Sequence, residues 1–256
     1  MNVGTPTATV GPGHRLFAKY AHAPNNLGYC GPEGVQAIRE SATGERSVDL
    51  TDVARRFSGA WPYQSTAADL AGIDDPMDAR VVRSYWTGND VTDAIDPRKF
   101  GEALFERIKP QAAHYWAHLD ESLLDEAAPT HGFHVLSVYP WTRLLPSGRP
   151  EPLFVLDSCR ITWATVDEVD GEDLVVTRQP LEHVDGALRL GDPSRTRVSW
   201  RKSGQQFIEE PTAGDVVAVH WGNVCDVLTR DEADTLERWT HWQLEAIRPR
   251  LESAAR

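Results

Sequence analysis

The chain has 256 residues, of which 41% are hydrophobic and nine are tryptophan. A chain of this length buries most of its unfolded surface, so we expect a packed core that needs no disulfide staples. Its 38 acidic and 26 basic side chains give a formal net charge of -12, which repels phosphate backbones and anionic lipid. We therefore exclude nucleic acid as a partner.

The three cysteines, Cys30, Cys159 and Cys225, lie far apart and form no CxxC pair. Such a set argues against a disulfide framework and against a zinc knuckle, and it is typical of a reducing compartment. The N-terminus has no basic start followed by an apolar run, and no segment approaches the roughly 20 apolar residues of a membrane span. We predict a cytoplasmic protein that does not contact a membrane.

Helical patterns dominate the first half of the chain, after a Gly-, Pro- and Thr-rich segment over residues 1–13 that we expect to form a flexible tail. DDPMDARVVRSYWTGN predicts a helix that starts with the Asp-Pro pair at 75–76 and stops at Gly88. DPRKFGEALFERIKP repeats this arrangement, with an Asp-Pro start at 96–97 and an end at Pro110.

The composition changes after residue 128. FHVLSVYPW and PLFVLDSCRITWATV are rich in β-branched and aromatic residues and flank a Pro-, Ser- and Gly-containing turn, which predicts a β-hairpin over 133–166. Short strand candidates follow as far as DVVAVHW at 215–221 and indicate a small antiparallel sheet or half-barrel. Thr229 and Glu232, in capping-box spacing, then start a closing helix.

Helices, then strands, then one closing helix predict an α+β fold in a single domain over residues 14–256. We expect its helical part over 14–128, its β part over 131–222 and its C-terminal helix over 230–248. No Gly-rich phosphate loop follows a strand, so we identify no cofactor of the nucleotide type.

The segment PNNLGYCGPEGVQAI places Cys30 just before a predicted helix start at residue 31 or 32. A thiol at a helix N-terminus has a lowered pKa and can act as a nucleophile. We assign His134 as its candidate general base and Asp157 as the group that orients the imidazole, although pairing them in the predicted hairpin requires a bulge. Alternatively, Cys30 is only a small buried side chain.

Histidines form a second candidate site. His114 and His118 are spaced i,i+4 and so share one face of a helix, and together with His134 they are candidate ligands of a divalent metal. The glutamate of the zincin motif is absent between them, so the alternative is two surface histidines and one satisfied at a strand end. A third group, from His220 to Cys225, has no catalytic spacing and is interpreted as a packed corner.

The order of these parts, with a cysteine that opens a helix and a later histidine and carboxylate, resembles that of papain-like and transglutaminase-like enzymes. The likeness extends over roughly residues 25–160 and covers order alone. GPEG follows Cys30, where the papain group has an aromatic residue. This resemblance implies a cysteine-dependent hydrolase or an acyl or amidyl transferase.

Several blocks together, among them FAKYAHAPNNLGYCGP, HGFHVLSVYPW and GDVVAVHWGNVCDVLT, resemble an uncharacterised bacterial family that is frequent in actinobacteria and known only as a domain of unknown function. Some members look to be encoded near nickel-iron hydrogenase genes. The resemblance thus implies an accessory role in metalloenzyme assembly, with a hydrogenase subunit or maturation factor as protein partner. It assigns no catalytic residue. An accessory factor, a cysteine enzyme and a non-catalytic interaction module all stay open.

Overall fold

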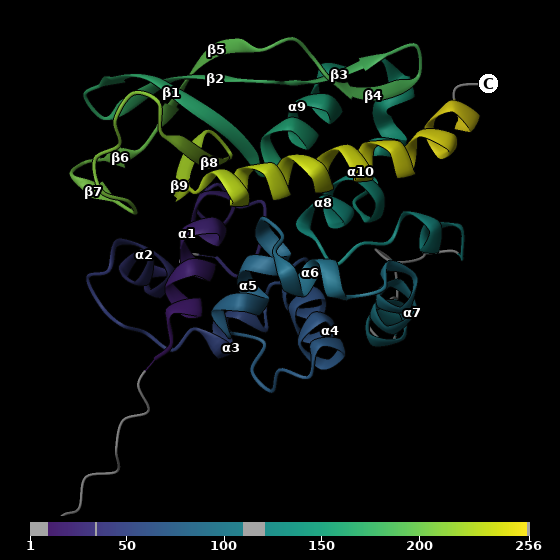
Figure 1. Cartoon of the computed structure of the whole chain (residues 1–256), viewed down its shortest axis with the longest axis horizontal. Coiled ribbons are helices and arrows are strands. Elements are labelled where there is room, and N and C mark those ends of the chain that lie inside the picture. Colours follow the sequence, from purple (N-terminus) through teal and green to yellow (C-terminus); the bar gives the residue numbers. More distant parts are fainter. Residues whose placement is uncertain (1–9, 34, 110–120, 255–256) are drawn as a thin grey trace, which may run out of the picture.

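The computed structural model describes residues 10–33, 35–109 and 121–254. Helices of the N-terminal half form one layer, the strands form a second, and the long C-terminal helix runs between them (Figure 1). This arrangement confirms the predicted α+β class. Within these ranges, no helix combines the length and the apolar character needed to cross a membrane.

The first layer contains seven helices over the described residues. They are α1 (Pro12–Asn26), α2 (Gln36–Thr43), α3 (Thr51–Ala54), α4 (Trp61–Ala71), α5 (Ala79–Trp86), α6 (Asp90–Ala94) and α7 (Pro97–Ile108). Shorter helical segments follow it: η2 (Glu121–Glu126), α8 (His131–Phe133), the π-helical η3 (His134–Val138), η4 (Pro140–Ser147) and α9 (Pro150–Cys159). The closing helix is α10 (Arg230–Ala254).

Five strands close into a barrel in the order β1-β2-β5-β9-β8. These strands are β1 (Thr162–Asp170), β2 (Asp173–Arg178), β5 (Ser194–Ser199), β8 (Val216–His220) and β9 (Asn223–Leu228). The pairs are antiparallel except β5 and β9, which run parallel at Ser199 and Asn223. Two hairpins extend the layer: β3 (Leu181–Val184) with β4 (Ala187–Leu190), and β6 (Arg201–Lys202) with β7 (Gln205–Gln206). The sheet is therefore a closed barrel that is antiparallel apart from one pair, in line with the antiparallel sheet or half-barrel indicated by the sequence.

Helix caps explain which boundaries the sequence predicts well. Asp96 accepts a hydrogen bond from the Lys99 amide (2.8 Å) and starts α7 at Pro97, as predicted. Thr229 and Glu232 form the predicted capping box before α10. The carboxylate of Asp75 instead caps a separate turn, so α5 starts three residues later than expected, with Asp78 as its N-cap.

The predicted β-hairpin over 133–166 is wrong, because helical segments occupy residues 131–159 and the first strand starts at Thr162. A short apolar run such as LFVL fits a buried helix as well as a strand, and Pro150 and Pro152 suit the first turn of a helix. The β part thus spans 162–228 rather than 131–222, and it includes β9, which was not predicted.

The loop that holds Cys30 also differs from the prediction. No helix starts at residue 31 or 32, because α2 starts at Gln36, and Gly28 and Gly31 have positive φ angles of 77° and 78° that break the helical path. The Asn25 side-chain amide donates to the carbonyl oxygens of Cys30 (2.9 Å) and Pro32 (2.7 Å) and holds the loop in place. At the N-terminus, α1 starts at Pro12, inside the segment predicted as a tail.

Buried apolar side chains join the two layers. The main core includes residues of α1, α4, α5 and α7, and it continues into Ala218 of β8, Cys225 of β9 and Leu236 of α10. A second core fills the barrel, and a third lies beneath the C-terminal half of α10. The helical layer and the barrel therefore share a hydrophobic core, with α10 covering their junction.

Asp157 of α9 ties this helix to the barrel. Its carboxylate accepts two hydrogen bonds from Arg178 of β2 (3.1 and 2.8 Å), one from Arg160 (3.1 Å) and one from the Leu181 amide (2.9 Å). Burial raises the pKa of Asp157, but these donors and positive charges outweigh it and hold the pKa below its usual range.

Replacing Asp157 by Asn should lower the free energy of unfolding by about 3 kcal/mol, because it leaves the buried guanidinium of Arg160 without a counter-charge. Urea unfolding at neutral pH measures this. Asp167→Asn is the matched control: Asp167 pairs with the exposed Arg195 on β5, where we expect a loss below about 1 kcal/mol. Equal losses in the two variants would contradict the structural role of Asp157.

Candidate metal centre

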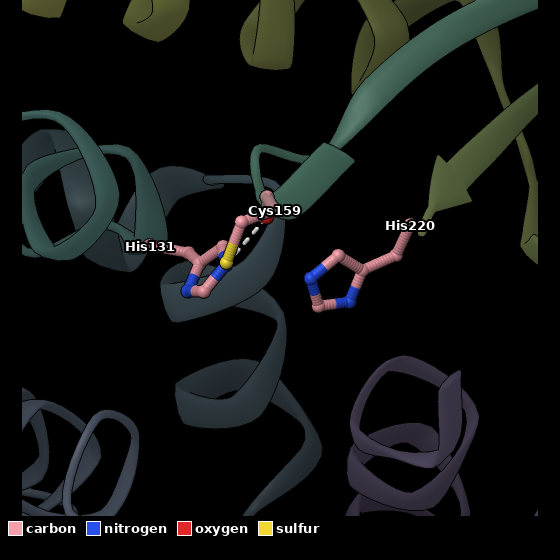
Figure 2. Close-up of side chains that lie close together, drawn as sticks. All are labelled: His131, Cys159 and His220. Atoms are coloured by element: carbon pink, nitrogen blue, oxygen red, sulfur yellow. Dashed lines mark hydrogen bonds between the residues drawn. The ribbon is translucent and has the colours of Figure 1, made fainter. Parts of the chain in front are cut away.

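Three side chains that are distant in the sequence converge at the junction of the layers (Figure 2). His131 is the first residue of α8, Cys159 the last of α9 and His220 the last of β8. One potential ligand atom from each lies within 4.8 Å of the other two, and the Cys159 Sγ lies 4.0 Å from His131 Nε2. The group therefore has the residue types and the spacing of a metal site.

Local hydrogen bonds place these elements. Thr130 caps α8, its hydroxyl accepting from the Phe133 amide (3.4 Å). The Trp221 amide donates to the carbonyl oxygen of Ser158 (2.8 Å), which fastens the end of β8 to the end of α9. Cys159 follows Ser158 and His220 precedes Trp221, so this bond holds Cys159 and His220 side by side.

His220 presents a ring nitrogen with no partner. Its Nδ1 lies 2.8 Å from the carbonyl oxygen of Tyr20 on α1, an acceptor, so Nδ1 carries the proton of the neutral imidazole. Nε2 consequently holds a lone pair, is buried and has no hydrogen-bond partner in the described part of the chain. Figure 2 shows a ring nitrogen of His220 directed toward Cys159 and His131. Burial of such a group without a partner is costly, and a cation bound at this lone pair would satisfy it.

The protons around His131 lead to the same conclusion. The Tyr85 hydroxyl donates its single proton to the carbonyl oxygen of Gly59 (2.5 Å). The same proton would be needed for a hydrogen bond from the hydroxyl to His131 Nδ1, 2.8 Å away. His131 Nε2 lies 2.9 Å from the Cys159 carbonyl oxygen and donates to it only if it carries the ring proton. The hydroxyl and the neutral imidazole thus hold two protons for three contacts, and a cation beside Nε2 would resolve the shortage.

His131 does not bind a second proton at neutral pH. Burial, followed by the neighbouring rings of His220 and His134, lowers the pKa of His131 well below its usual range, and the hydrogen bond with the Cys159 carbonyl only partly opposes this. A metal cation would instead be coordinated by the lone pairs of His131 and His220. Each Nδ1 would stay hydrogen-bonded, as is usual for metal-bound imidazole.

Cys159 also lies where a cation is favoured. Burial raises the pKa of its thiol to about 12, so the thiol is protonated at neutral pH. It stands at the C-terminal end of α9, where the helix dipole stabilises positive charge and disfavours a thiolate. A bound metal ion would favour the thiolate of Cys159, because its charge would be larger than any other in the site.

A cavity of about 260 Å³ adjoins the three residues. Its described lining contains no Asp, Glu, Lys or Arg, and it includes Cys30 and His134. The structure therefore brings two of the sequence-predicted catalytic residues to the same cavity as the His131, Cys159 and His220 group. The third, Asp157, lines a different cavity and is held by its arginines.

The electrostatics of Cys30 differ from the expectation. Burial raises the pKa of the Cys30 thiol to about 11, and a hydrogen bond with the Gly31 backbone opposes this only in part. Because Cys30 is in a loop and not at a helix N-terminus, no helix dipole lowers its pKa. Burial lowers the pKa of His134 to about 4, and its Nδ1 lies 3.2 Å from the Tyr63 hydroxyl. No hydrogen bond joins Cys30 to His134 within the described ranges.

The sequence-based metal site is only partly described. His114 and His118 lie outside the described residues, and His134 is near the cluster but not one of its three members. Sequence reasoning missed Cys159 as a ligand because its segment was assigned to a strand, and it missed His220 because its neighbourhood was interpreted as a packed corner. No spacing motif could have found the group, since each ligand comes from a different element.

Comparison with known proteins identifies a family but no activity. The model of a family described only as one of unknown function matches residues 9–254, almost the whole chain. No curated protein and no solved structure matches. The match confirms the sequence-based assignment to an uncharacterised family, whereas the actinobacterial origin and the link to hydrogenases stay predictions.

The buried histidines predict acid sensitivity of the metal-free protein. The pKa of His134 and of His220 is about 4 in the folded state, against about 6.5 in the unfolded chain. Between these values only the unfolded state binds the proton, so the free energy of unfolding falls as the pH drops below about 6.5, by up to about 1.4 kcal/mol per pH unit for each histidine. Urea unfolding between pH 7 and pH 5 measures this slope.

His134→Gln should reduce the slope, whereas His241→Gln, which alters an exposed histidine of α10, should leave it unchanged. A stability that stays constant from pH 7 to pH 5 would show that these imidazoles are not neutral and buried.

Proposed function

The chain belongs to DUF6390, a family of unknown function, and from the geometry of its site we propose that it binds a transition-metal ion through His131, Cys159 and His220. The observation that carries this proposal is the buried, unpartnered Nε2 of His220 beside a thiol and a second imidazole. Contacts with Tyr20 and Tyr85 hold the Nδ1 atoms of the two imidazoles, so that Nε2 of His220 is free to coordinate and Nε2 of His131 would exchange the Cys159 carbonyl oxygen for the ion.

The donor set selects the class of metal. Two imidazole nitrogens and one thiolate suit Zn²⁺, Cu⁺ or another borderline or soft ion, whereas Mg²⁺ and Ca²⁺ favour carboxylate oxygens, which the described lining does not offer. Three protein ligands leave a further coordination position for a group from the adjoining cavity, as in zinc sites that bind a fourth, exchangeable ligand. The bound ion would supply Lewis acidity, and the protein holds its ligands in the correct tautomers.

A cysteine nucleophile is the competing function, since Cys159 Sγ and His131 Nε2 are 4.0 Å apart and Tyr85 orients the imidazole. Nucleophilic attack requires the thiolate, and therefore a lowered thiol pKa or an effective base. The pKa of Cys159 is instead raised to about 12, and the pKa of His131 is well below its usual range. Proton transfer between them is unfavourable, and this favours the metal site.

Metal-free protein should bind one Zn²⁺ or Cu⁺ per chain, measured by competition with a chromogenic chelator. His131→Gln, Cys159→Ser and His220→Gln should each weaken binding by more than about 100-fold, and Tyr85→Phe by about 10- to 100-fold, because it removes the hydrogen bond that sets the tautomer. His241→Gln and Cys225→Ser are controls of matched chemistry.

Bound Zn²⁺ should also slow the alkylation of Cys159 in the same samples. Absence of stoichiometric binding by the wild-type protein, or equal affinity in all these variants, would rule out the site. Rapid alkylation of Cys159 below pH 8 that is slowed by His131→Gln would support the nucleophile instead.

We further propose that the metal serves an accessory role in metalloenzyme assembly, the role implied by the sequence resemblance. In support, Tyr29 lines the cavity beside the metal ligands, stacks on Trp221 (4.0 Å between ring centroids) and is 45% exposed. Phe154 is 62% exposed and packs against the same Trp221 ring. An apolar surface next to a metal site is suited to contact with a protein partner.

The accessory role predicts metal transfer. Zn²⁺-loaded protein purified without a histidine tag should form a complex with a hydrogenase subunit or maturation factor encoded beside it, and should lose metal when that partner is added. Tyr29→Ala and Phe154→Ala should weaken the complex, whereas Leu70→Ala, a matched loss of an exposed apolar side chain on α4, should not. Metal binding with no complex would refute the accessory role alone.

A further inference from the structure

A second cavity, of about 290 Å³, lies where the C-terminal turns of α1 and Arg39 of α2 meet the barrel. Its barrel wall is the strip from Ser199 to Phe207, which carries the β6–β7 hairpin. None of its lining residues belongs to the group of His131, Cys159 and His220, so it is separate from the candidate metal centre.

The charge of this cavity is opposite to that of the chain. Whereas the chain carries a net charge of -12, Arg39, Arg201 and Lys202 line the cavity, and its described lining includes no Asp or Glu. Arg39 is paired with Glu45 (2.8 Å). Across the described residues, Arg201 and Lys202 form no ion pair. Positive charge gathered in a cleft raises the local concentration of anions.

Both cations are held on a fixed support. The turn of the hairpin has positive φ angles at Ser203 (50°) and Gly204 (77°), and the Glu172 carboxylate accepts hydrogen bonds from both of their amides (3.3 and 3.1 Å). The guanidinium of Arg201 lies over the ring of Trp200, 4.7 Å from its centroid. The hairpin is therefore anchored and presents its charges in a defined place.

His22 and Phe207 give the cavity an apolar and hydrogen-bonding surface. His22 of α1 packs edge-on against Phe207, with 5.0 Å between ring centroids. Burial and the nearby charges of Arg39 and Lys202 lower the pKa of His22, which keeps the imidazole neutral with one donor and one acceptor. His22 has no hydrogen bond to any other described residue. It is thus available to a ligand that also contacts Phe207.

We propose that this cavity binds a small phosphorylated molecule with a planar ring, such as a nucleoside monophosphate. Its phosphate would contact Arg201 and Lys202, since a guanidinium fork and an ammonium are the groups that hold phosphate oxygens in proteins. The ring would lie against Phe207 and His22. A volume of about 290 Å³ is at the low end for small-molecule sites, and the acidic remainder of the chain repels a polyanion such as nucleic acid.

The test uses the full chain and AMP as probe, measured by isothermal titration calorimetry. We expect saturable binding of one AMP per chain. Arg201→Ala and Lys202→Ala should each weaken it about tenfold or more, as expected for loss of a charge-assisted hydrogen bond. Arg189→Ala is the matched control, since it removes one positive charge from an exposed pair with Glu182 on β3, and it should change the affinity less than about twofold.

Phe207→Leu tests the ring contact and is a mild change for folding. It should lower the affinity for AMP but leave the affinity for ribose 5-phosphate, which has no base and should bind more weakly, unchanged. Circular dichroism checks that each variant is folded. No AMP binding by the wild-type protein, or the same loss of affinity in Arg189→Ala as in Lys202→Ala, would overturn the proposal. The result is independent of metal binding, because the two cavities share no lining residue.

Discussion

The hydrogen bond between His220 Nδ1 and the Tyr20 carbonyl is the contact on which the architecture and the candidate chemistry both depend. It joins β8 of the barrel to α1 of the helical layer, 200 residues apart in sequence. The same bond assigns the imidazole proton to Nδ1 and leaves Nε2 as a lone pair in the interior. Packing the two layers together therefore also produces a ligand atom without a partner.

A cysteine and two histidines can support either nucleophilic catalysis or metal binding. The absence of charged side chains in the described lining of the cavity beside them favours metal binding. With no Asp, Glu, Lys or Arg in that lining, no charged side chain there stabilises a thiolate or an imidazolium, and burial outweighs the local hydrogen bonds and shifts the pKa of each group so that its neutral form is favoured. Neutral imidazoles, and a thiol that loses its proton only when a metal cation binds its sulfur, are poor catalysts of acyl transfer but good metal ligands. The cavity near Phe207 shows the opposite arrangement, with fixed positive charges.

Prediction from sequence succeeded where a local interaction sets the structure. Asp96 before Pro97, and Thr229 with Glu232, satisfy the amides of their own helix starts, so α7 and α10 begin where the sequence indicates. It failed where the same residues suit two structures. The apolar segment of α9 was assigned to a strand, because an unbroken apolar run shows no helical period, and Cys30 was assigned to a helix start that its flanking glycines prevent.

By itself the sequence determined the α+β class, the order of helices and strands, the lack of disulfide-type cysteine spacing and the family, because composition, periodicity and capping are properties of short segments. Tertiary structure alone decided which polar side chains meet. His131, Cys159 and His220 come from a short helix, a helix end and a strand end, and only closure of the barrel against the helices brings them within 4.8 Å. Their protonation states follow from burial and from backbone carbonyls such as that of Tyr20, which no sequence pattern encodes.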